Sequence, residues 1–246
     1  MQLLLEIARC PHVVSCITQP KHTHPCSEIV SSQAAQSLAT HQLPEPWSGD
    51  LVHAPILFVS SNPSISEVEE YPHWDWSDDA IIDYFTRRFE GGRKQWIKDG
   101  TKTLQRDGTY ARATAFWAAV RQRAAELLQR DPRPGFVYAL TEVVHCKSLS
   151  ERGIRKAQTY CVPHFLQRVL EASEARIIVI LGAHARMAVQ NIFNIPDTVT
   201  LYGPTNVFCH ERYVLSLPHP NAHSPRKCTA CLTDDELHRV YAFLRT

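Results

Sequence analysis

Short apolar runs that end in turn-forming residues alternate along the chain with stretches of helical apolar spacing. The apolar runs predict buried strands at 55–60, 136–144, 176–181 and 213–217. The helical spacing predicts helices at 78–90, 111–130, 154–173, 183–193 and 234–244. Strands that are separated by helices form right-handed crossovers and a mainly parallel sheet. We therefore predict an α/β protein with three layers, α/β/α, around a central, mainly parallel four-stranded sheet.

The stretch at 91–110 departs from this pattern because it is polar, contains glycine and carries Trp96 among basic residues. The basic residues in and just before this excursion are Arg87, Arg88, Arg93, Lys94, Lys98, Lys102 and Arg106. Such a run is either a solvated surface or a contact for a polyanion, and the sequence leaves both open. We interpret residues 1–246 as a single domain with a basic polar excursion at about 91–110.

The composition is that of a folded chain. Of the 246 residues 44% are apolar, and 26 Lys and Arg balance 25 Asp and Glu, which excludes disordered and collagen-like proteins. The longest apolar run, Ile177–Leu181, is far shorter than the roughly 20 residues of a membrane-spanning helix. The beginning of the chain lacks the basic segment of a secretory signal. We therefore expect a cytoplasmic protein, of the bacterial cytosol or nucleoid, without a membrane span.

The unusual residues of the sequence fall in the loops that follow the predicted strands. These loops are Ser61–Ser64, Glu142–Ser150, Gly182–His184 and Pro218–Asn221. Because open α/β sheets bind ligands at the carboxyl ends of their strands, we expect the functional site there. Eight cysteines in a reducing compartment are not a disulfide framework, and their grouping suggests thiolate ligands for a metal or cluster.

Several of these segments resemble the motifs of one family. The family has a strand, a loop that binds its metal cluster, a helix and a further strand in this order. The matching segments here are Val143–Cys146, Cys161, Pro163–Leu166 and Arg176–Ala183. Leu217–Pro220 resembles the family's His-Pro-Ser loop, and Ser61–Ser64 resembles its first motif in the Asn-Pro form. The chain thus resembles the uracil-DNA glycosylase superfamily, and within it most closely the iron-sulfur-containing family 4 branch.

This resemblance implies a monofunctional DNA glycosylase that flips a base out of DNA and hydrolyses its N-glycosidic bond. Asn62 would hold the attacking water, and His219, if neutral, would donate to O2 of the departing base. An aromatic residue that stacks on the flipped base should follow the first motif, where Tyr71, Trp74 and Trp76 are available. The expected partner is DNA, and we expect a monomer. The residues expected to contact DNA, near the first motif and in the wedge loop 219–226, are Ser64, Asn221, His223 and Arg226.

Glu142 departs from the family pattern, in which this position is an Asn that recognises uracil. An ionised carboxylate only accepts hydrogen bonds, so it disfavours uracil and suits the N4 amino group of cytosine. A protonated Glu142 would also donate to N3, and burial would raise its pKa in the needed direction. Because a glycosylase for ordinary cytosine would destroy its host's genome, we expect a modified, 5-substituted cytosine, as in phage DNA, and a role in antiviral defence.

Two alternatives to this function stay open. If Glu142 points elsewhere, the protein is an ordinary uracil-DNA glycosylase of base-excision repair. If serines in place of glycines, at Ser60 or Ser61 and at Ser64, weaken the water site, the protein is a non-catalytic binder of damaged or modified DNA. A lyase reaction through Lys147 is not expected, because this residue falls in the cluster-side loop.

The resemblance also implies four thiolate ligands, for which the candidates are Cys10, Cys16, Cys146 and Cys161. They would hold a [4Fe-4S] cluster or, alternatively, a structural Zn²⁺. Cys10 and Cys16 are spaced more widely than the family's N-terminal pair, so Cys26 or the pair Cys228 and Cys231 could replace them. A group held by four cysteines has no open coordination position, and we therefore expect it to have a structural role.

Overall fold

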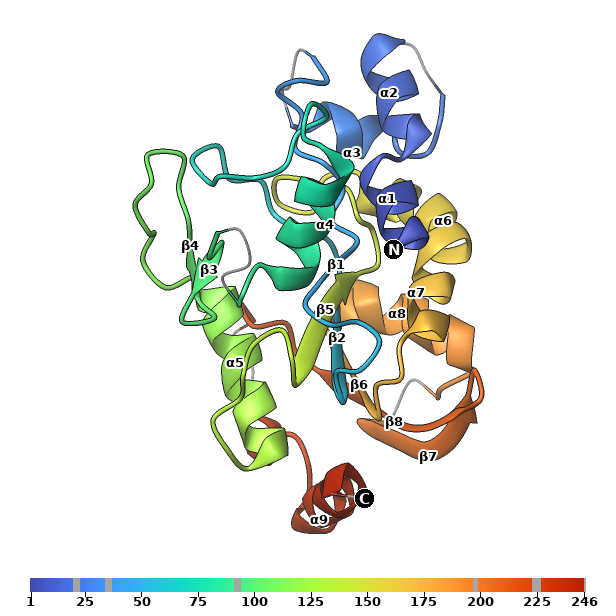
Figure 1. The fold of residues 1–246 in the computed structure, drawn as a ribbon. Helices are drawn as coiled ribbons and strands as arrows, with labels where there is room; N and C mark the ends of the chain where they lie inside the picture. Colours follow the sequence, from blue (N-terminus) through green and yellow to red (C-terminus); the bar gives the residue numbers. More distant parts are fainter. Residues whose placement is uncertain (20–22, 34–36, 91–93, 197–198, 223–226, 246) are drawn as a thin grey trace.

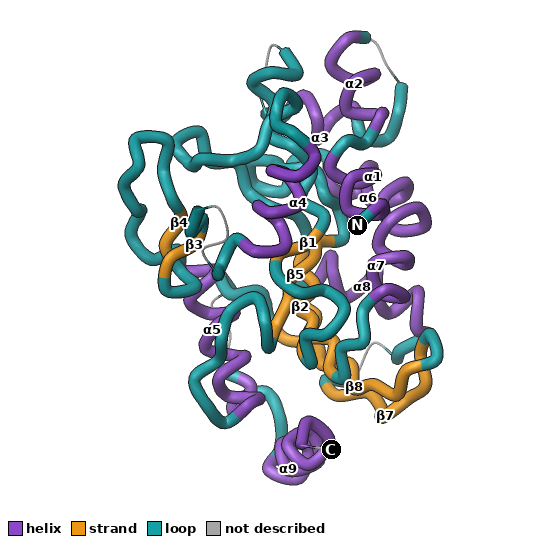
Figure 2. The backbone as a smooth tube through the Cα atoms, in the orientation of Figure 1, coloured by secondary structure: helices purple, strands orange, loops and turns teal. Residues whose placement is uncertain are grey.

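The computed structural model describes residues 1–19, 23–33, 37–90, 94–196, 199–222 and 227–245. A six-stranded sheet forms the centre of this part of the chain (Figures 1 and 2). Its strands are β1 (Trp47–Ser48), β2 (Ile56–Ser60), β5 (Tyr138–Glu142), β6 (Ile177–Leu181), β7 (Leu201–Val207) and β8 (His210–Leu217). They lie in the order β1-β5-β2-β6-β8-β7. The four inner strands run parallel and are the four predicted from the sequence.

The sheet has two more strands than expected, and both are antiparallel strands at its edges. β1 pairs Trp47 with Thr141 of β5 over only two residues. β7 pairs with β8 and contains Pro204 beside a shift in register. Proline argues against a central strand but is tolerated at an edge, where its missing N–H faces no neighbour. A two-residue strand and a strand with an internal proline give too weak a pattern for prediction.

Helices cover both faces of the sheet and complete the predicted three layers. One face carries α1 (Gln2–Ala8), α2 (Pro11–Thr18), α3 (Ser27–Ser31), α4 (Asp78–Arg87), α6 (Ile154–Cys161), α7 (Gln167–Ala172) and α8 (Ala183–Phe193). The other face carries α5 (Ala115–Leu128) and α9 (Asp234–Arg245). In Figure 1, α5 lies to the left of the sheet and α6, α7 and α8 lie to its right. Every residue of β2, β5 and β6 is buried, as expected for strands covered on both faces.

The predicted helix at 154–173 is present but changes its geometry in the middle. α6 is followed by the π-helical turn η1 (Val162–Leu166), and α7 then continues the segment. Because Pro163 has no N–H and its ring crowds the preceding turn, the helix widens there. Gly153, just before α6, has a φ of 80°, and a Cβ at this position would be 2.5 Å from the backbone nitrogen of Ile29. Glycine therefore allows α3 to approach the start of α6.

The sequence pattern does not predict the N-terminal helices, which have five to eight residues each. α1 packs on α4, and α3 packs on α6, so these short helices contact the later part of the chain. The polar excursion contains the small antiparallel pair β3 (Ile97–Lys98) and β4 (Lys102–Thr103), and the 3₁₀ turn η2 (Cys228–Ala230) precedes α9. Within the described ranges, every helix is too short or too polar to cross a membrane.

Candidate active site

A cavity of about 660 Å³ opens at the carboxyl ends of the parallel strands. Its wall includes Ser60 of β2, Glu142 of β5 and Leu181 of β6, together with His219 from the loop after β8. The loops that the sequence singles out therefore meet at one edge of the sheet, where open α/β sheets bind their ligands.

The loop after β2 is fastened to the loop after β5, and this contact orients Asn62. The Val143 N–H donates to the Ser60 carbonyl at 2.9 Å. Asn62 Nδ2 donates to Ser148 Oγ at 2.9 Å and to the Pro63 carbonyl at 3.0 Å. Among the described residues no hydrogen bond uses Asn62 Oδ1. The side chain is thus fixed through its nitrogen, and its oxygen can accept a hydrogen bond from water.

His219 is held as a neutral imidazole with its proton on Nε2. The Asn221 N–H donates to His219 Nδ1 at 3.2 Å, so Nδ1 is the acceptor and Nε2 carries the proton of the neutral ring. Burial lowers the pKa of His219, and this effect outweighs the opposite effect of the nearby Glu151 charge. At neutral pH the ring therefore offers an N–H donor to a group bound in the cavity.

The loop that carries His219 is fixed from α5 and from the start of α8. Arg123, buried in α5, donates to the Pro218 carbonyl at 2.9 Å. The His219 ring stacks on Phe116, with centroids 5.8 Å apart and an angle of 28° between the rings. Gly182 has a φ of 89°, and a Cβ there would be 3.1 Å from the Cβ of His219. The position of the imidazole thus depends on glycine at residue 182.

Glu142 is a buried carboxyl group, and its surroundings favour its neutral form. Its side chain lines the cavity, although only 2% of the residue is exposed. Burial, together with the negative charge of Glu45, raises the pKa of Glu142 well above its usual value. Its Oε2 atom has no hydrogen-bond partner among the described residues. The buried part of the cavity wall therefore presents a carboxyl group with a raised pKa and an oxygen, Oε2, that has no hydrogen-bond partner among the described residues.

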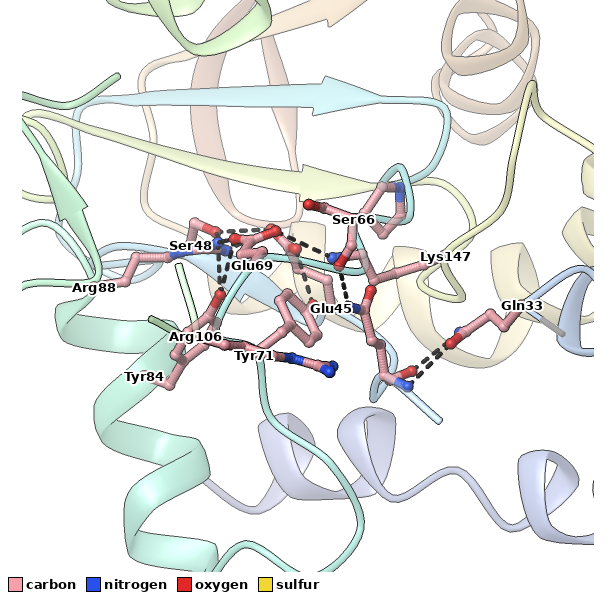
Figure 3. Close-up of polar contacts among 12 residues, drawn as sticks. Gln33, Glu45, Ser48, Ser66, Glu69, Tyr71, Tyr84, Arg88, Arg106 and Lys147 are labelled. Atoms are coloured by element: carbon pink, nitrogen blue, oxygen red, sulfur yellow. Dashed lines mark hydrogen bonds and ion pairs between the residues drawn. The ribbon is translucent and has the colours of Figure 1, made fainter. Parts of the chain in front are cut away.

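Four buried charged residues, Glu45, Glu69, Arg88 and Lys147, form a charged cluster that also lines the cavity (Figure 3). Arg88 Nη1 lies 2.9 Å from Glu45 Oε1, and Arg88 Nη2 lies 3.4 Å from Glu69 Oε1. Lys147 Nζ lies 3.7 Å from Glu69 Oε2. Burial alone would raise the pKa of Glu45, but the charges of Arg88 and Lys147 lower it. The cluster thus places two cations against two carboxylates.

The sequence from residue 46 to residue 244 matches the model of one family, the uracil DNA glycosylase superfamily. The chain belongs to this superfamily. Membership implies a DNA glycosylase, which acts on DNA and hydrolyses N-glycosidic bonds, and the three-layer α/β/α architecture agrees with it. No curated protein matches the chain.

In a glycosylase of this superfamily the base gains negative charge as it leaves, and we expect His219 to donate a hydrogen bond to it. His219→Ala is expected to lower the single-turnover rate of base release about 100-fold, because it removes an oriented donor. Rates are measured with oligonucleotides that carry the excised base, and His53→Ala, at an exposed histidine, serves as the control. Equal rates for His219→Ala and the wild type would contradict this role.

The aromatic wall of the glycosylase cavity differs from the one expected. Tyr71 is fully buried, and the ammonium group of Lys147 lies 3.4 Å from its ring centroid. Trp74 packs against the apolar core. Neither ring lines the cavity, whereas Phe116 and Trp117 at the start of α5 do. Among the described residues, the aromatic side chains of the cavity wall therefore come from α5, and not from the segment directly after the first motif.

The expected DNA contacts lie at the rim of the cavity where the structure describes them. Ser64 and Asn221 line the cavity and are exposed. His223 and Arg226 lie outside the described residues. Some cations of the basic run are engaged within the chain: Lys94 Nζ lies 2.6 Å from Glu70, Lys102 Nζ lies 2.9 Å from Asp99, and Arg88 is buried. These contacts favour the solvated-surface interpretation for part of the excursion.

Four cysteines gather around a second, small cavity between the N-terminal helices and the loop after β5. They are Cys10, Cys26, Cys146 and Cys161. A hydrogen bond with Cys161, together with burial, raises the pKa of Cys26. Burial raises the pKa of Cys10 to about 11. Cys16, one of the predicted ligands, does not line this cavity, and Cys26 takes its place.

The remaining cysteine pair cannot join this group. Cys228 is buried on the opposite face of the sheet, where its N–H donates to Glu126 Oε2 of α5 at 2.6 Å, and Cys231 packs beside it. Among the described residues, no three His, Cys, Asp or Glu side chains are placed to hold a single metal ion.

Sequence patterns missed several residues that line the glycosylase cavity, namely Glu45, Glu69, Phe116, Trp117 and Glu151. One signal was available for Phe116. Neighbouring aromatic residues on a helix cannot both face the core. Because Trp117 belongs to the buried stripe of α5, Phe116 must point in another direction. The three carboxylates lie in segments without regular structure, for which apolar spacing carries no information.

Proposed function

We propose that this DNA glycosylase excises a 5-substituted cytosine, as found in modified phage DNA, and that it acts in defence against such DNA. The observation that carries the proposal is Glu142, a buried carboxyl group in the cavity wall with a raised pKa and an unpartnered Oε2. Asn62 would hold the attacking water through Oδ1, and His219 Nε2–H would donate to O2 of the base.

A protonated carboxyl group suits cytosine in both recognition and chemistry. Its carbonyl oxygen can accept from the N4 amino group, and its O–H can donate to N3. When the bond between N1 and the sugar breaks, N3 of cytosine can take this proton, which neutralises the departing base. Glu142 would then be both the residue that recognises the base and its general acid.

Uracil is the second candidate, and the neutral state of Glu142 supports it as well. A carboxylic acid can turn its O–H toward uracil O4 and accept from N3–H with its other oxygen. The repulsion between an ionised carboxylate and O4 therefore does not arise at neutral pH. Uracil N3 already carries a hydrogen, however, so proton transfer to N3 would assist only the departure of cytosine.

The size and polarity of the cavity favour a substituent on the base. About 660 Å³ is within the range of pockets that hold drug-sized ligands, and a pyrimidine alone is smaller. The charged cluster lines the same cavity and offers donors and acceptors for a hydroxymethyl or glucosylated group. The excursion at 91–110 does not contribute to the described lining of the cavity.

We further propose that Cys10, Cys26, Cys146 and Cys161 hold a [4Fe-4S] cluster. Four thiols that surround a cavity without meeting at one point suit a group whose irons each bind a different cysteine. A single Zn²⁺ would need its ligands to converge. When bound, the cluster would fasten the N-terminal helices to the loop after β5.

The contacts of Lys147 favour a glycosylase without lyase activity. Lys147 lies in the wall of the active-site cavity, and not away from it as expected from the sequence. Its ammonium group is nevertheless engaged, at 3.7 Å from Glu69 and 3.4 Å from the ring centroid of Tyr71. An amine held by these two groups is poorly placed to attack the sugar. Strand cleavage that follows base release without added alkali would contradict this part of the proposal.

The proposal is tested by mass spectrometry of the released base. Oligonucleotides carry uracil, cytosine, 5-hydroxymethylcytosine or glucosylated 5-hydroxymethylcytosine. Release of modified cytosine, without release of ordinary cytosine, is the expected result. Release of uracil alone would overturn the proposal in favour of ordinary base-excision repair.

Asn62→Ala separates an enzyme from a non-catalytic binder. The substitution removes the oxygen that orients the water, so base release should slow about 100-fold, whereas affinity for the same DNA should change little. Both are measured, by single-turnover kinetics and by fluorescence anisotropy. A wild type that binds modified DNA but releases no base would make the protein a binder.

A further inference from the structure

We infer that Glu151 is the general base that takes a proton from the attacking water. The inference rests on the proposed glycosylase reaction but not on which base is excised. Glu151 lies in the loop after β5 and lines the cavity beside the first motif.

The position of Glu151 is fixed on both of its oxygens. Ser61 Oγ donates to Glu151 Oε1 at 2.5 Å, which brings the carboxylate next to Asn62. Glu151 Oε2 lies 3.8 Å from His184 Nε2 at the start of α8. The side chain is 46% exposed, so water reaches it from the open side of the cavity.

The backbone at Glu151 is strained. Ser150 and Glu151 have φ values of 50° and 58°, in the left-handed region that residues other than glycine rarely adopt. Such conformations cost about 1–3 kcal/mol and persist where the surrounding structure imposes them, often at functional sites. Here the imposed turn aims the Glu151 carboxylate back at Ser61.

The reaction needs a carboxylate at this place. Asn62 can orient a water molecule through Oδ1, but an amide does not take up a proton. The carboxyl groups among the described residues of the cavity wall are Glu45, Glu69, Glu142 and Glu151. Burial raises the pKa of Glu142 and so favours its neutral form, and Glu45 and Glu69 are paired with the cations of the charged cluster. Glu151 is the carboxylate that remains for the water.

The step balances with the residues in place. An O–H bond of the water breaks as its oxygen bonds to C1′ of the sugar, and the proton passes to Glu151. The bond from C1′ to N1 breaks, and its electron pair leaves with the base. Hydrogen bonding from His219, and proton transfer from Glu142 where the base is cytosine, accommodate the added negative charge. The negative charge of Glu151 also stabilises the positive charge that develops on the sugar.

Three titratable groups on neighbouring elements face Glu151, and they bear on its pH dependence. The imidazoles of His184 in α8 and of His219 in the loop after β8 both lie near the Glu151 carboxylate. Glu142, at the end of β5, stays protonated over the acid range. A protonated His219 is still a hydrogen-bond donor. A general base acts only in its ionised form, so a loss of activity at acid pH that Glu151→Gln abolishes would identify Glu151 as that base.

The test compares Glu151→Gln, Glu151→Asp and, as a control at the opposite end of the sheet, Glu174→Gln. The substrate is whichever oligonucleotide the wild type acts on, uracil or modified cytosine. Glu151→Gln should lower the single-turnover rate about 100-fold. The activity that remains in this variant should no longer fall at acid pH. Glu151→Asp should keep the acid-side loss and part of the rate. The control should match the wild type.

Chemical rescue separates catalysis from loop structure. Sodium formate should restore part of the activity of Glu151→Ala, because a free carboxylate can occupy the vacated position, and chloride should not. Affinity for DNA with a tetrahydrofuran abasic site should stay near the wild-type value. An active wild type combined with an unchanged rate in Glu151→Gln would overturn the inference and leave the proposed function standing. A loss of rate without formate rescue, with the acid-side pH dependence retained, would also overturn it.

Discussion

Glu142→Gln is expected to lower the rate of modified-cytosine release by about 10²–10⁴-fold at neutral pH, the usual contribution of a positioned general acid. Glutamine has the shape and the hydrogen-bonding groups of the protonated carboxyl group. It can therefore still accept from N4 and donate to N3 of cytosine, but it has no proton to transfer. The substitution thus keeps recognition of the base and removes proton transfer, so the affinity for the DNA should be almost unchanged.

Single-turnover kinetics and binding measurements on the same DNA check this prediction, with Glu142→Asp as the matched control that retains an acid. The aspartate variant should be faster than the glutamine variant. Release of uracil, if the wild type shows it, should change little in Glu142→Gln, because uracil N3 needs no proton. A glutamine variant that releases modified cytosine as fast as the wild type would rule out Glu142 as the acid.

The same variant should alter the pH dependence of stability. Because the pKa of Glu142 is raised in the folded protein, the folded state binds more protons than the unfolded state between the two pKa values. The stability that Glu142 contributes is complete below the ordinary carboxyl pKa and is lost as the pH rises through the raised one. Glutamine does not titrate, so Glu142→Gln removes this loss of stability at higher pH. The melting temperature of the variant should therefore increase relative to the wild type from acid to neutral pH.

Arg88→Met is expected to destabilise the protein by about 3–5 kcal/mol, because it leaves buried carboxylates without their cation. Arg88 is almost fully buried, and its guanidinium contacts both Glu45 and Glu69. Urea unfolding measures the loss. The adjacent Arg87→Met is the control, since the Arg87 side chain is 56% exposed and its nearest carboxylates lie 3.9 Å away.

The control substitution should change the free energy of unfolding by less than about 0.5 kcal/mol. A variant that also replaces Glu45 and Glu69 by Gln should recover part of the stability lost in Arg88→Met, because it no longer buries unpaired charge. Equal stabilities for Arg88→Met and Arg87→Met would show that the charged cluster does not act as a unit.

The sequence predicts the inner sheet well because each inner strand is buried on both faces. Ile177–Leu181 is a continuous apolar run for this reason, and its end marks an edge of the active-site cavity. The edge strand β7 escapes prediction because half-exposed residues and Pro204 remove the apolar pattern. Asn62, Glu142 and His219 could be found because each directly follows or ends such a strand.

The rest of the site depends on contacts between segments distant in the sequence. Tyr71 was a reasonable stacking candidate by position, but only the fold shows that Lys147 covers its ring. Cys26 replaces Cys16 because the short N-terminal helices, which the sequence does not predict, decide which thiol faces Cys161. Glu151 was invisible because its role depends on a strained turn, and apolar spacing says nothing of backbone strain.

The loop after β5 has a consequence for how this protein can evolve. Within ten residues it begins at the Glu142 carboxyl group in the cavity wall, continues through a thiol of the second cavity and ends at Glu151 beside the first motif. Surface loops usually tolerate insertions and deletions, but a change of length here would displace all three positions at once. Variation in substrate among relatives of this chain should therefore accumulate on parts of the cavity wall outside this loop, such as Thr114 just before α5.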